Sequence, residues 1–428
     1  MAGLDGSARA FFTAALVHFC RKPALVITAD SARAEKTCAD LDAFYPGEVR
    51  LLPSRELFAP EEVLTRSEES QQMRLQFFEW LYSHKHGIYV APQAALLSQV
   101  LPPETWQGLA IKLKPGDLLE REEFLSELTA RGYERTGLTE NKGHFSARGD
   151  IVDVYPPGRE TPFRLELYDN RLESIKLFDP LTQRSTEKLS EAVISPAREL
   201  MVTDRAFQRG RQAIERNLEH AVSRLNRRGD KDAAVSLKQY VSRHLERLAQ
   251  PEGLDILSSY LPFFYNTPAS LLDYLPQNFL VIIEEAAAVA EAGENLRREY
   301  EQFIGSSLVE TEMLGGSSDL LWKEEELFTN LPCPLVGFSL FSGSDPVLRA
   351  KQFYSLEAKS APSYHGQWGL LKSDLQNWTA EGYRAYILAV SARRGHSLRD
   401  LIVEDNRPEA SLNGGPEPVT LNRLPVGV

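Results

Sequence analysis

The sequence predicts a multidomain α/β protein in which a parallel-sheet unit is interrupted by a small strand-rich unit. The first hundred residues alternate helical and strand patterns, which is typical of a parallel sheet with helices on both faces. From about residue 110 short strands dominate, and from about residue 197 long helical stretches precede the next strands. We therefore expect four segments, at residues 1–109, 110–196, 197–332 and 333–428.

Hydrophobic periodicity places the elements of the first segment. Short apolar runs bounded by turn residues predict buried strands, and apolar residues at helical spacing predict helices. The expected strands are 24–28, 49–52 and 87–90, and the expected helices are 7–19, 31–44, 68–83 and one that begins at Pro92.

The later segments follow from the same patterns. Long helices are expected at 204–225 and 230–249, and apolar runs at 256–261 and 279–283 are expected to rejoin a sheet before a helix near 286–300. The last unit is expected to start near Pro334, with a strand at 335–341, a helix at 369–381, a strand at 383–389 ahead of a further helix, a turn at Gly414–Gly415 and a strand at 419–422.

The most informative stretch is 145–184, where apolar and polar residues alternate on both sides of a turn at 156–158. This pattern predicts a β-hairpin followed by a third strand at about 172–178. Because strand side chains alternate, Arg164, Glu166 and Tyr168 should lie on the face opposite Phe163 and its apolar neighbours. Arginine and tyrosine on an open sheet face are typical anchors for a protein partner, and an ordinary solvated face is the alternative.

This stretch resembles the UvrA-binding domain shared by UvrB and the bacterial transcription-repair coupling factors, the Mfd family. The matching residues are Arg148-Gly149-Asp150, Asp153-Val154-Tyr155-Pro156, Arg164-Leu165-Glu166-Leu167-Tyr168-Asp169 and Phe178-Asp179-Pro180-Leu181-Thr182. The resemblance implies that Arg148, Arg164 and Tyr168 contact UvrA, with tyrosine where the family often has phenylalanine. If the hairpin places Arg148 across from Tyr168, all three share one face, whereas a one-residue slip moves Arg148 to the other face. On this pattern the Arg-Gly-Asp triplet lies inside a strand, which disfavours a cell-adhesion motif.

A second motif lies at the N-terminus and aligns with a Walker A loop, G-x-x-x-x-G-K-[ST]. Gly3 matches the first glycine and Gly6 falls on a variable position of the motif. Ala8 stands in place of the second glycine and lacks its backbone freedom, Arg9 replaces the lysine that reaches phosphates, and Ala10 has no oxygen for magnesium. The resemblance therefore implies a helicase-like (RecA/P-loop-like) fold with a degenerate nucleotide site and no ATP hydrolysis.

The counterpart of the Walker B strand is 281–285, which ends in Glu284 and Glu285. Glutamate stands where active members of the family have aspartate, and the start of a helix is the alternative explanation for two acidic residues. UvrB also has a tyrosine-rich hairpin that clamps damaged DNA, whereas residues 51–66 contain only Phe58 as an aromatic. The degenerate phosphate loop and the missing hairpin both favour the coupling factors over UvrB, which keeps a working loop. The UvrB-like domain 1a, UvrA-binding domain 2, domain 1b and domain 3 of the coupling factors would correspond to the four segments.

Composition argues against several other functions, including DNA binding over the whole surface, metal binding and membrane insertion. The net charge of −12 argues against a chain that binds DNA strongly over its whole surface. Residues 205–247 are nevertheless rich in arginine, and solvated faces of long helices are the simpler explanation. Three cysteines and scattered histidines form no metal-ligand pattern, and no apolar run is long enough to cross a membrane. Together with the absence of a signal-peptide pattern, these features favour the cytoplasm.

The resemblance implies that this chain is an N-terminal fragment that recruits UvrA to RNA polymerase stalled at DNA lesions. It implies no enzyme activity, cofactor or metal for the fragment itself, because RNA polymerase, double-stranded DNA and ATP are engaged by domains absent here. Two alternatives remain open from the residues: a nucleotide-binding helicase-like ATPase, and a DNA-binding module that uses the basic helices between residues 205 and 247.

Overall fold

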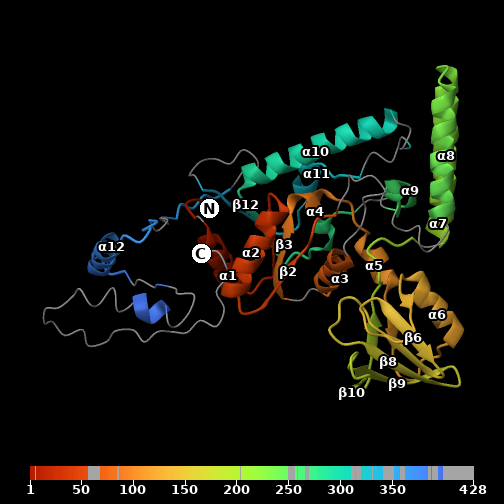
Figure 1. Cartoon of the computed structure of the whole chain (residues 1–428), viewed down its shortest axis with the longest axis horizontal. Coiled ribbons are helices and arrows are strands. Elements are labelled where there is room, and N and C mark those ends of the chain that lie inside the picture. The colour runs from red at the N-terminus through yellow and green to blue at the C-terminus, as the bar shows by residue number, and fades with distance from the viewer. Residues whose placement is uncertain are drawn as a thin grey trace.

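A five-stranded parallel sheet forms the centre of the first of two sheet-containing units (Figure 1). The computed structural model describes residues 1–398 except 5, 56–67, 84–85, 203, 249–255, 258, 266–268, 310–313, 315–319, 330, 341–350, 357–361, 384–386 and 388–393. The strand order is β13-β12-β1-β3-β2. The strands are β1 (Ala24–Thr28), β2 (Glu48–Leu51), β3 (Gly87–Pro92), β12 (Leu280–Glu284) and β13 (Leu335–Phe338).

Helices cover both faces of this sheet because its central strands are apolar on both sides. Alternate residues of β1, such as Ala24 and Val26, pack with α1 (Ser7–Cys20) and α2 (Ser31–Phe44). The intervening Leu25 and Ile27 belong to a larger core on the other face. That core includes residues of α3 (Glu68–Tyr82), α4 (Gln93–Leu97) and the long α10 (Ala286–Val309). The predicted parallel sheet with helices on both faces is confirmed.

The sheet draws its strands from three of the expected segments. β12 pairs in parallel with β1, and β13 pairs in parallel with β12, with Leu335 opposite Val281. Residues after Pro334 therefore begin by completing the edge of the first sheet. The expected start of a separate unit near residue 333 is wrong in this respect, since a single apolar strand pattern does not reveal which sheet it joins.

The inserted domain holds a six-stranded sheet with the order β10-β9-β8-β7-β6-β5. Its elements are α6 (Arg121–Ala130), β5 (Glu134–Arg135), β6 (His144–Arg148), β7 (Ile151–Val154), β8 (Phe163–Tyr168), β9 (Arg171–Phe178) and β10 (Ser185–Leu189). Helix α6 covers one face, where Phe124 and Leu128 share a core with Phe145, Val152 and Leu165. Chain entry and exit run side by side, because β4 (Ile111–Leu113) pairs antiparallel with β11 (Ala192–Ile194) after the short α5 (Pro103–Leu109).

A tight turn at Gly149–Asp150 corrects the expected hairpin. The stretch before residue 156 is two strands, because β6 pairs antiparallel with β7 and Arg148 lies opposite Ile151. Gly149 has φ +57°, and Asp150 is not among the residues with positive φ, which fits a two-residue turn with glycine at its first central position. The Arg-Gly-Asp triplet thus spans a turn and does not lie inside a strand. The Gly-Asp pair between two alternating runs was the signal available in the sequence.

The helical part contains a long antiparallel hairpin of α7 (Asp204–Arg227) and α8 (Lys231–Leu248). Its base meets the short α9 (Leu261–Phe264), where Phe207 stacks on Phe264 with ring centroids 6.0 Å apart. The expectation that 256–261 rejoins a sheet is wrong: its described residues are helical turns, and Ile256 and Leu257 are buried in the larger core. A short apolar run fits a buried helical turn as well as a strand.

The remaining elements are the 3₁₀ helix η2 (Leu271–Tyr274), α11 (Glu324–Thr329) and α12 (Trp368–Ala380). The expected helix at 369–381 is confirmed, and α12 buries none of its residues. The expected strand at 383–389 lies mostly outside the described residues, and Gly414–Gly415 and 419–422 lie wholly outside them. Most of 51–66 is also outside, so the damage-clamping hairpin stays an untested expectation. Within the described ranges, no helix is both long and apolar enough to cross a membrane.

A buried ion cluster joins the first sheet unit to the exit of the inserted domain. Glu199, just after that exit, accepts hydrogen bonds from Arg74 Nε at 2.6 Å and Arg55 Nη2 at 2.5 Å. Burial alone would raise the pKa of Glu199, but the two guanidinium groups outweigh it and lower the pKa to about 2. The cluster fixes a carboxylate of the domain exit to α3 and to the segment after β2.

Candidate functional sites: an exposed sheet face and a cleft beside the first sheet

The three residues expected to bind a partner share the outward face of the inserted sheet. Directly paired residues in an antiparallel sheet point to the same side, so the row Arg148–Ile151–Glu166 lies on one face. Arg164 and Tyr168 alternate with buried neighbours in β8 and lie on that face as well. Arg148 and Tyr168, whose register the sequence left open, are not paired with each other, because β7 lies between β6 and β8 and Tyr168 pairs with Arg171. The three residues still share one face, because Arg148 pairs with Ile151 and Ile151 pairs with Glu166, and paired residues point to the same side.

Arg164 is already engaged within the domain. Its Nε and Nη2 donate to the two carboxylate oxygens of Asp153, each at 2.8 Å, and its Nη1 donates to the Gln183 carbonyl at 2.9 Å. The guanidinium also lies 4.5 Å from the ring centroid of Phe178, and only 16% of the side chain is exposed. Asp153 thus occupies the fork that a partner's carboxylate would use. Sequence reasoning missed Asp153, although its place on a neighbouring strand of the same expected sheet was visible.

Arg148 and Tyr168 remain open to solvent. Arg148 is exposed and is oriented by hydrogen bonds to the Gly137 carbonyl, one of them 3.1 Å long from Nε. Tyr168 is 72% exposed and ends β8 at a turn in which Asp169 and Asn170 both have positive φ. Ile151 between them is 37% exposed. This open part combines a cation, a ring and an aliphatic side chain, which suits a protein partner.

Five of the seven residues expected at the nucleotide site line a cleft of about 410 Å³ at the end of the first sheet, whereas Gly3 and Ala8 are not among its lining residues. Gly6, Arg9 and Ala10 contribute from the start of α1, and Glu284 and Glu285 from the end of β12. Arg9 forms an ion pair with Glu285 and donates from Nε to the Leu4 carbonyl at 2.9 Å. The side chain that would reach a phosphate is therefore neutralised by a carboxylate of this chain.

The backbone of this loop is also committed elsewhere. The Gly3 N–H donates to the Ser339 carbonyl at 3.1 Å, and the Ala2 N–H donates to the Tyr354 carbonyl at 2.9 Å. A phosphate loop works by presenting such N–H groups to the ligand. With Ala10 offering no oxygen to a metal, the residues do not fit a magnesium nucleotide.

Three carboxylates, of Asp40, Glu284 and Glu285, and three cations, of Arg9, Arg33 and Lys36, line the cleft. Glu284 accepts a hydrogen bond from Thr37 Oγ1 at 3.0 Å, and burial raises its pKa more than Thr37 and Arg9 lower it. Burial likewise raises the pKa of Asp40, whose side chain also lines the cleft. Glu284 ends β12 and Glu285 directly precedes α10, whose first turn has no acidic residue, so the helix-start explanation does not account for Glu284.

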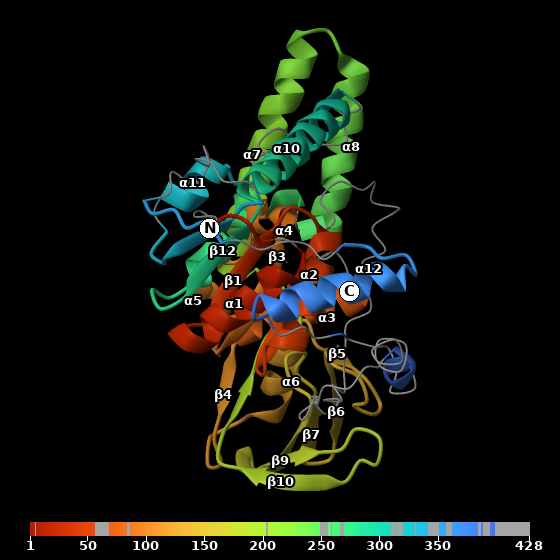
Figure 2. The same ribbon diagram turned by 90° about the vertical axis from the view of Figure 1, so that its left-hand side faces the viewer.

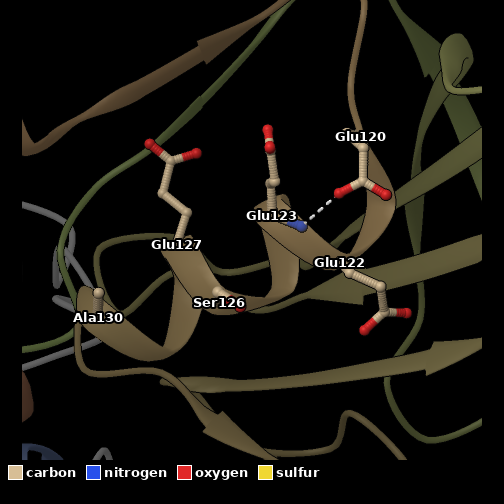
Figure 3. A pocket seen from close by; sticks show the side chains of 6 residues that line it. All are labelled: Glu120, Glu122, Glu123, Ser126, Glu127 and Ala130. Atoms are coloured by element: carbon tan, nitrogen blue, oxygen red, sulfur yellow. Dashed lines mark hydrogen bonds between the residues drawn. The ribbon is translucent and has the colours of Figure 1, made fainter.

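A second acidic group lies along α6 (Figure 3). Glu120 caps the helix by accepting from the Glu123 N–H at 2.7 Å, and Glu122 and Glu123 occupy the first turn. Acidic side chains in a first turn are stabilised by the helix dipole, so the group has a structural explanation. Among the described residues, no cluster of three His, Cys, Asp or Glu side chains is arranged to hold a metal ion.

Known proteins are similar to this chain both in the inserted domain and along most of its length. The model of the UvrB interaction domain family matches residues 111–200, which begin with β4 and end just after β11. A transcription-repair-coupling factor of Bacillus subtilis is 31% identical over 94% of this chain, and one of Staphylococcus aureus is 25% identical over 95%. The chain is homologous to the transcription-repair-coupling factors. It spans about a third of the length of these relatives, 34% in each case. The family resemblance found in the sequence and the α/β architecture with a UvrB interaction domain are thereby confirmed.

Proposed function

We propose that this chain recruits UvrA in transcription-coupled repair, through the outward face of the inserted sheet. The observation that carries the proposal is that Arg148, Arg164 and Tyr168 share one face within the segment that matches the UvrB interaction domain family. Homology to the coupling factors supports a role in linking transcription to repair. In the longer relatives, RNA polymerase, double-stranded DNA and ATP would be engaged by parts of the protein beyond this chain.

The three residues contribute differently in this proposal. Arg148 and Tyr168 contact UvrA directly because their side chains are exposed. Arg164 acts as a positioning residue, since Asp153 and Gln183 engage its donors and its guanidinium holds Phe178 beneath the face. Truncating Arg164 would leave the buried Asp153 carboxylate unpaired, so loss of binding in such a variant would not identify a contact.

Calorimetric titration of UvrA with this chain, beside the double variant Arg148→Ala/Tyr168→Ala, tests the proposal. We expect the variant to keep its melting temperature and to lose at least about 10-fold in affinity, because truncated interface anchors commonly cost 1–2 kcal/mol or more. The matched control is Arg205→Ala/Tyr383→Ala, which removes the same exposed residue types outside this sheet. Absence of binding by the unaltered chain, or equal affinity of both double variants, would contradict the proposal.

We further propose that the chain does not hydrolyse ATP. The ion pair between Arg9 and Glu285 and the commitment of the Gly3 N–H to Ser339 support this. Equilibrium binding of labelled ATP with and without magnesium is the direct test, and no saturable binding is expected. Tight magnesium-dependent binding would instead support the alternative of a helicase-like ATPase with a variant phosphate loop.

A further inference from the structure

The α7–α8 hairpin is the most basic part of an acidic chain. Residues 204–248 contain eleven Lys and Arg against six Asp and Glu, a net charge of +5 in a chain of −12. An apolar stripe that includes Ile214 and Leu218 of α7 and Leu237 and Val241 of α8 holds the two helices together. The basic side chains therefore point outward, and those of Arg224, Arg227, Arg228 and Lys231 are all exposed.

The tip of this hairpin extends away from the rest of the molecule. Figures 1 and 2 both show the turn between α7 and α8 beyond every other labelled element. Helix α7 has 24 residues, which corresponds to a rod of about 36 Å at roughly 1.5 Å per residue. A narrow projecting tip can approach an extended partner that the broad acidic body would repel.

The turn at the tip is well defined. Gly229 has φ +85°, the Gly229 N–H donates to the Asn226 carbonyl at 3.1 Å, and the Asp230 N–H donates to the Leu225 carbonyl at 3.1 Å. These two bonds make a Schellman motif, which fixes how α7 ends. Asp230 Oδ1 then accepts from the Ala233 N–H at 3.3 Å and caps α8, so this carboxylate has a structural partner.

The arginines at the tip form one surface. Arg224 and Arg227 lie in the last turn of α7 and Arg228 directly follows it, so the spacing i, i+3, i+4 places the three on one side. Lys231 opens α8 directly after the turn. In the part of the chain that the structure describes, none of these four cations forms an ion pair, whereas Arg211 further down the helix pairs with Glu215 at 3.0 Å.

We propose that this tip, residues 224–231, binds the phosphate backbone of nucleic acid. Phosphate contacts need exposed Lys and Arg without carboxylate partners, and the tip provides four. Protein hot spots also use large apolar anchors, and residues 224–232 include no aromatic side chain. An acidic protein partner is therefore the less suitable occupant. The proposal does not depend on UvrA binding, which uses a different domain.

The test is fluorescence anisotropy of a labelled duplex DNA with the full chain, over a salt series from low to physiological ionic strength. Arg224→Glu/Arg227→Glu/Arg228→Glu is compared with Arg205→Glu/Arg211→Glu/Arg216→Glu, which changes net charge equally on the same helix nearer its base. We expect the tip variant to reduce the slope of log affinity against log salt by about 2–3, since each phosphate contact contributes roughly 0.9. The base variant should retain most of the slope.

Cations near a helix C-terminus also stabilise the helix, so thermal unfolding of both variants is measured alongside. A tip variant that melts like the unaltered chain and loses DNA binding supports the proposal, and single-stranded DNA and RNA probes then show which backbone form is preferred. No salt-dependent binding by the unaltered chain, or equal losses in the two variants, would overturn it. Retained DNA binding by the tip variant would also overturn it and would redirect attention to an acidic protein partner.

Discussion

The cleft beside the first sheet and the outward face of the inserted sheet both contain arginines where the sequence suggests ligand binding. In the cleft, Arg9 is paired with Glu285, and the neighbouring wall holds both cations and carboxylates. On the inserted sheet, Arg164 is paired with Asp153, but Arg148 and Tyr168 remain open at the same face. An arginine in a binding motif therefore does not by itself indicate ligand binding, because a carboxylate of the same chain can already occupy it. The predictions below separate paired arginines, which should affect stability, from open ones, which should affect binding.

The largest effect is expected at the buried cluster of Glu199 with Arg55 and Arg74. Glu199→Gln removes the buried carboxylate that two guanidinium groups share, which should lower the free energy of unfolding by about 3–5 kcal/mol. Urea denaturation measures this, and Glu191→Gln is the control because Glu191 is largely exposed, at 62%. A loss below about 1 kcal/mol would show that the cluster does not hold the two domains together.

The same cluster predicts a pH dependence. The folded-state pKa of Glu199 is lowered to about 2 from a usual value of 4.5, so its stabilisation is complete above pH 4.5 and is lost as pH falls towards 2. Between pH 5 and pH 3, the free energy of unfolding should therefore fall more steeply in the unaltered chain than in Glu199→Gln, as denaturation at each pH would measure. Parallel pH profiles of the two proteins would contradict the assignment.

A smaller loss is expected when the fork of Arg164 is emptied. Asp153→Asn replaces two charge-assisted hydrogen bonds by weaker ones and should destabilise the inserted domain by about 1.5–3 kcal/mol. Intrinsic fluorescence and thermal unfolding follow the change, with Asp150→Asn in the neighbouring turn as the control. A variant that unfolds like the unaltered chain would mean that Arg164 is available to a partner after all.

The cleft should respond more weakly. Arg9→Ala removes a partly exposed ion pair and a hydrogen bond to Leu4, so a loss of about 1 kcal/mol is expected. The variant Arg9→Lys/Ala10→Thr, which restores two Walker residues, should still bind no ATP because the Gly3 N–H remains bonded to Ser339. Saturable ATP binding by that variant would show that the side chains alone had disabled the site.

The smallest effect is expected for the hydroxyl of Tyr168. Tyr168→Phe keeps the exposed ring, so stability should stay within about 0.5 kcal/mol, and UvrA affinity should change by no more than about twofold. Calorimetry beside Tyr168→Ala separates the ring from the hydroxyl. A large loss in the phenylalanine variant would reveal a hydrogen bond to the partner.

Much of this architecture was predictable because local patterns agree with the fold. The buried strand at 24–28 and the helix at 31–44 coincide with β1 and α2, where a continuous apolar run and a helical stripe leave little choice. The outward orientation of Arg164 and Tyr168 followed from strand alternation. Strand partners were less accessible, because a strand such as 335–338 reads the same whichever sheet it joins.

The partners of the site residues could not be read from the sequence. The contact of Arg9 with Glu285 joins positions 276 residues apart, and that of Arg164 with Asp153 depends on the register of β7 against β8 across the connection at residues 155–162. A one-residue difference in such a register changes every opposing pair in the strand. The sequence therefore predicted the sheet face and the degenerate loop. It could not predict the ion pairs of Arg9 and Arg164, which decide whether these arginines can bind a ligand.

The pairing of β4 with β11 makes the inserted domain a portable module. Ile111 lies opposite Ile194, so the chain enters and leaves at neighbouring positions of one two-stranded ladder. Neighbouring strands are only about 5 Å apart, a gap that a very short peptide can bridge. Residues 111–194 could thus be excised with a brief linker closing the parent unit, or grafted into a surface loop of another scaffold. Adjacent termini of this kind are what allow one domain to be hosted inside another.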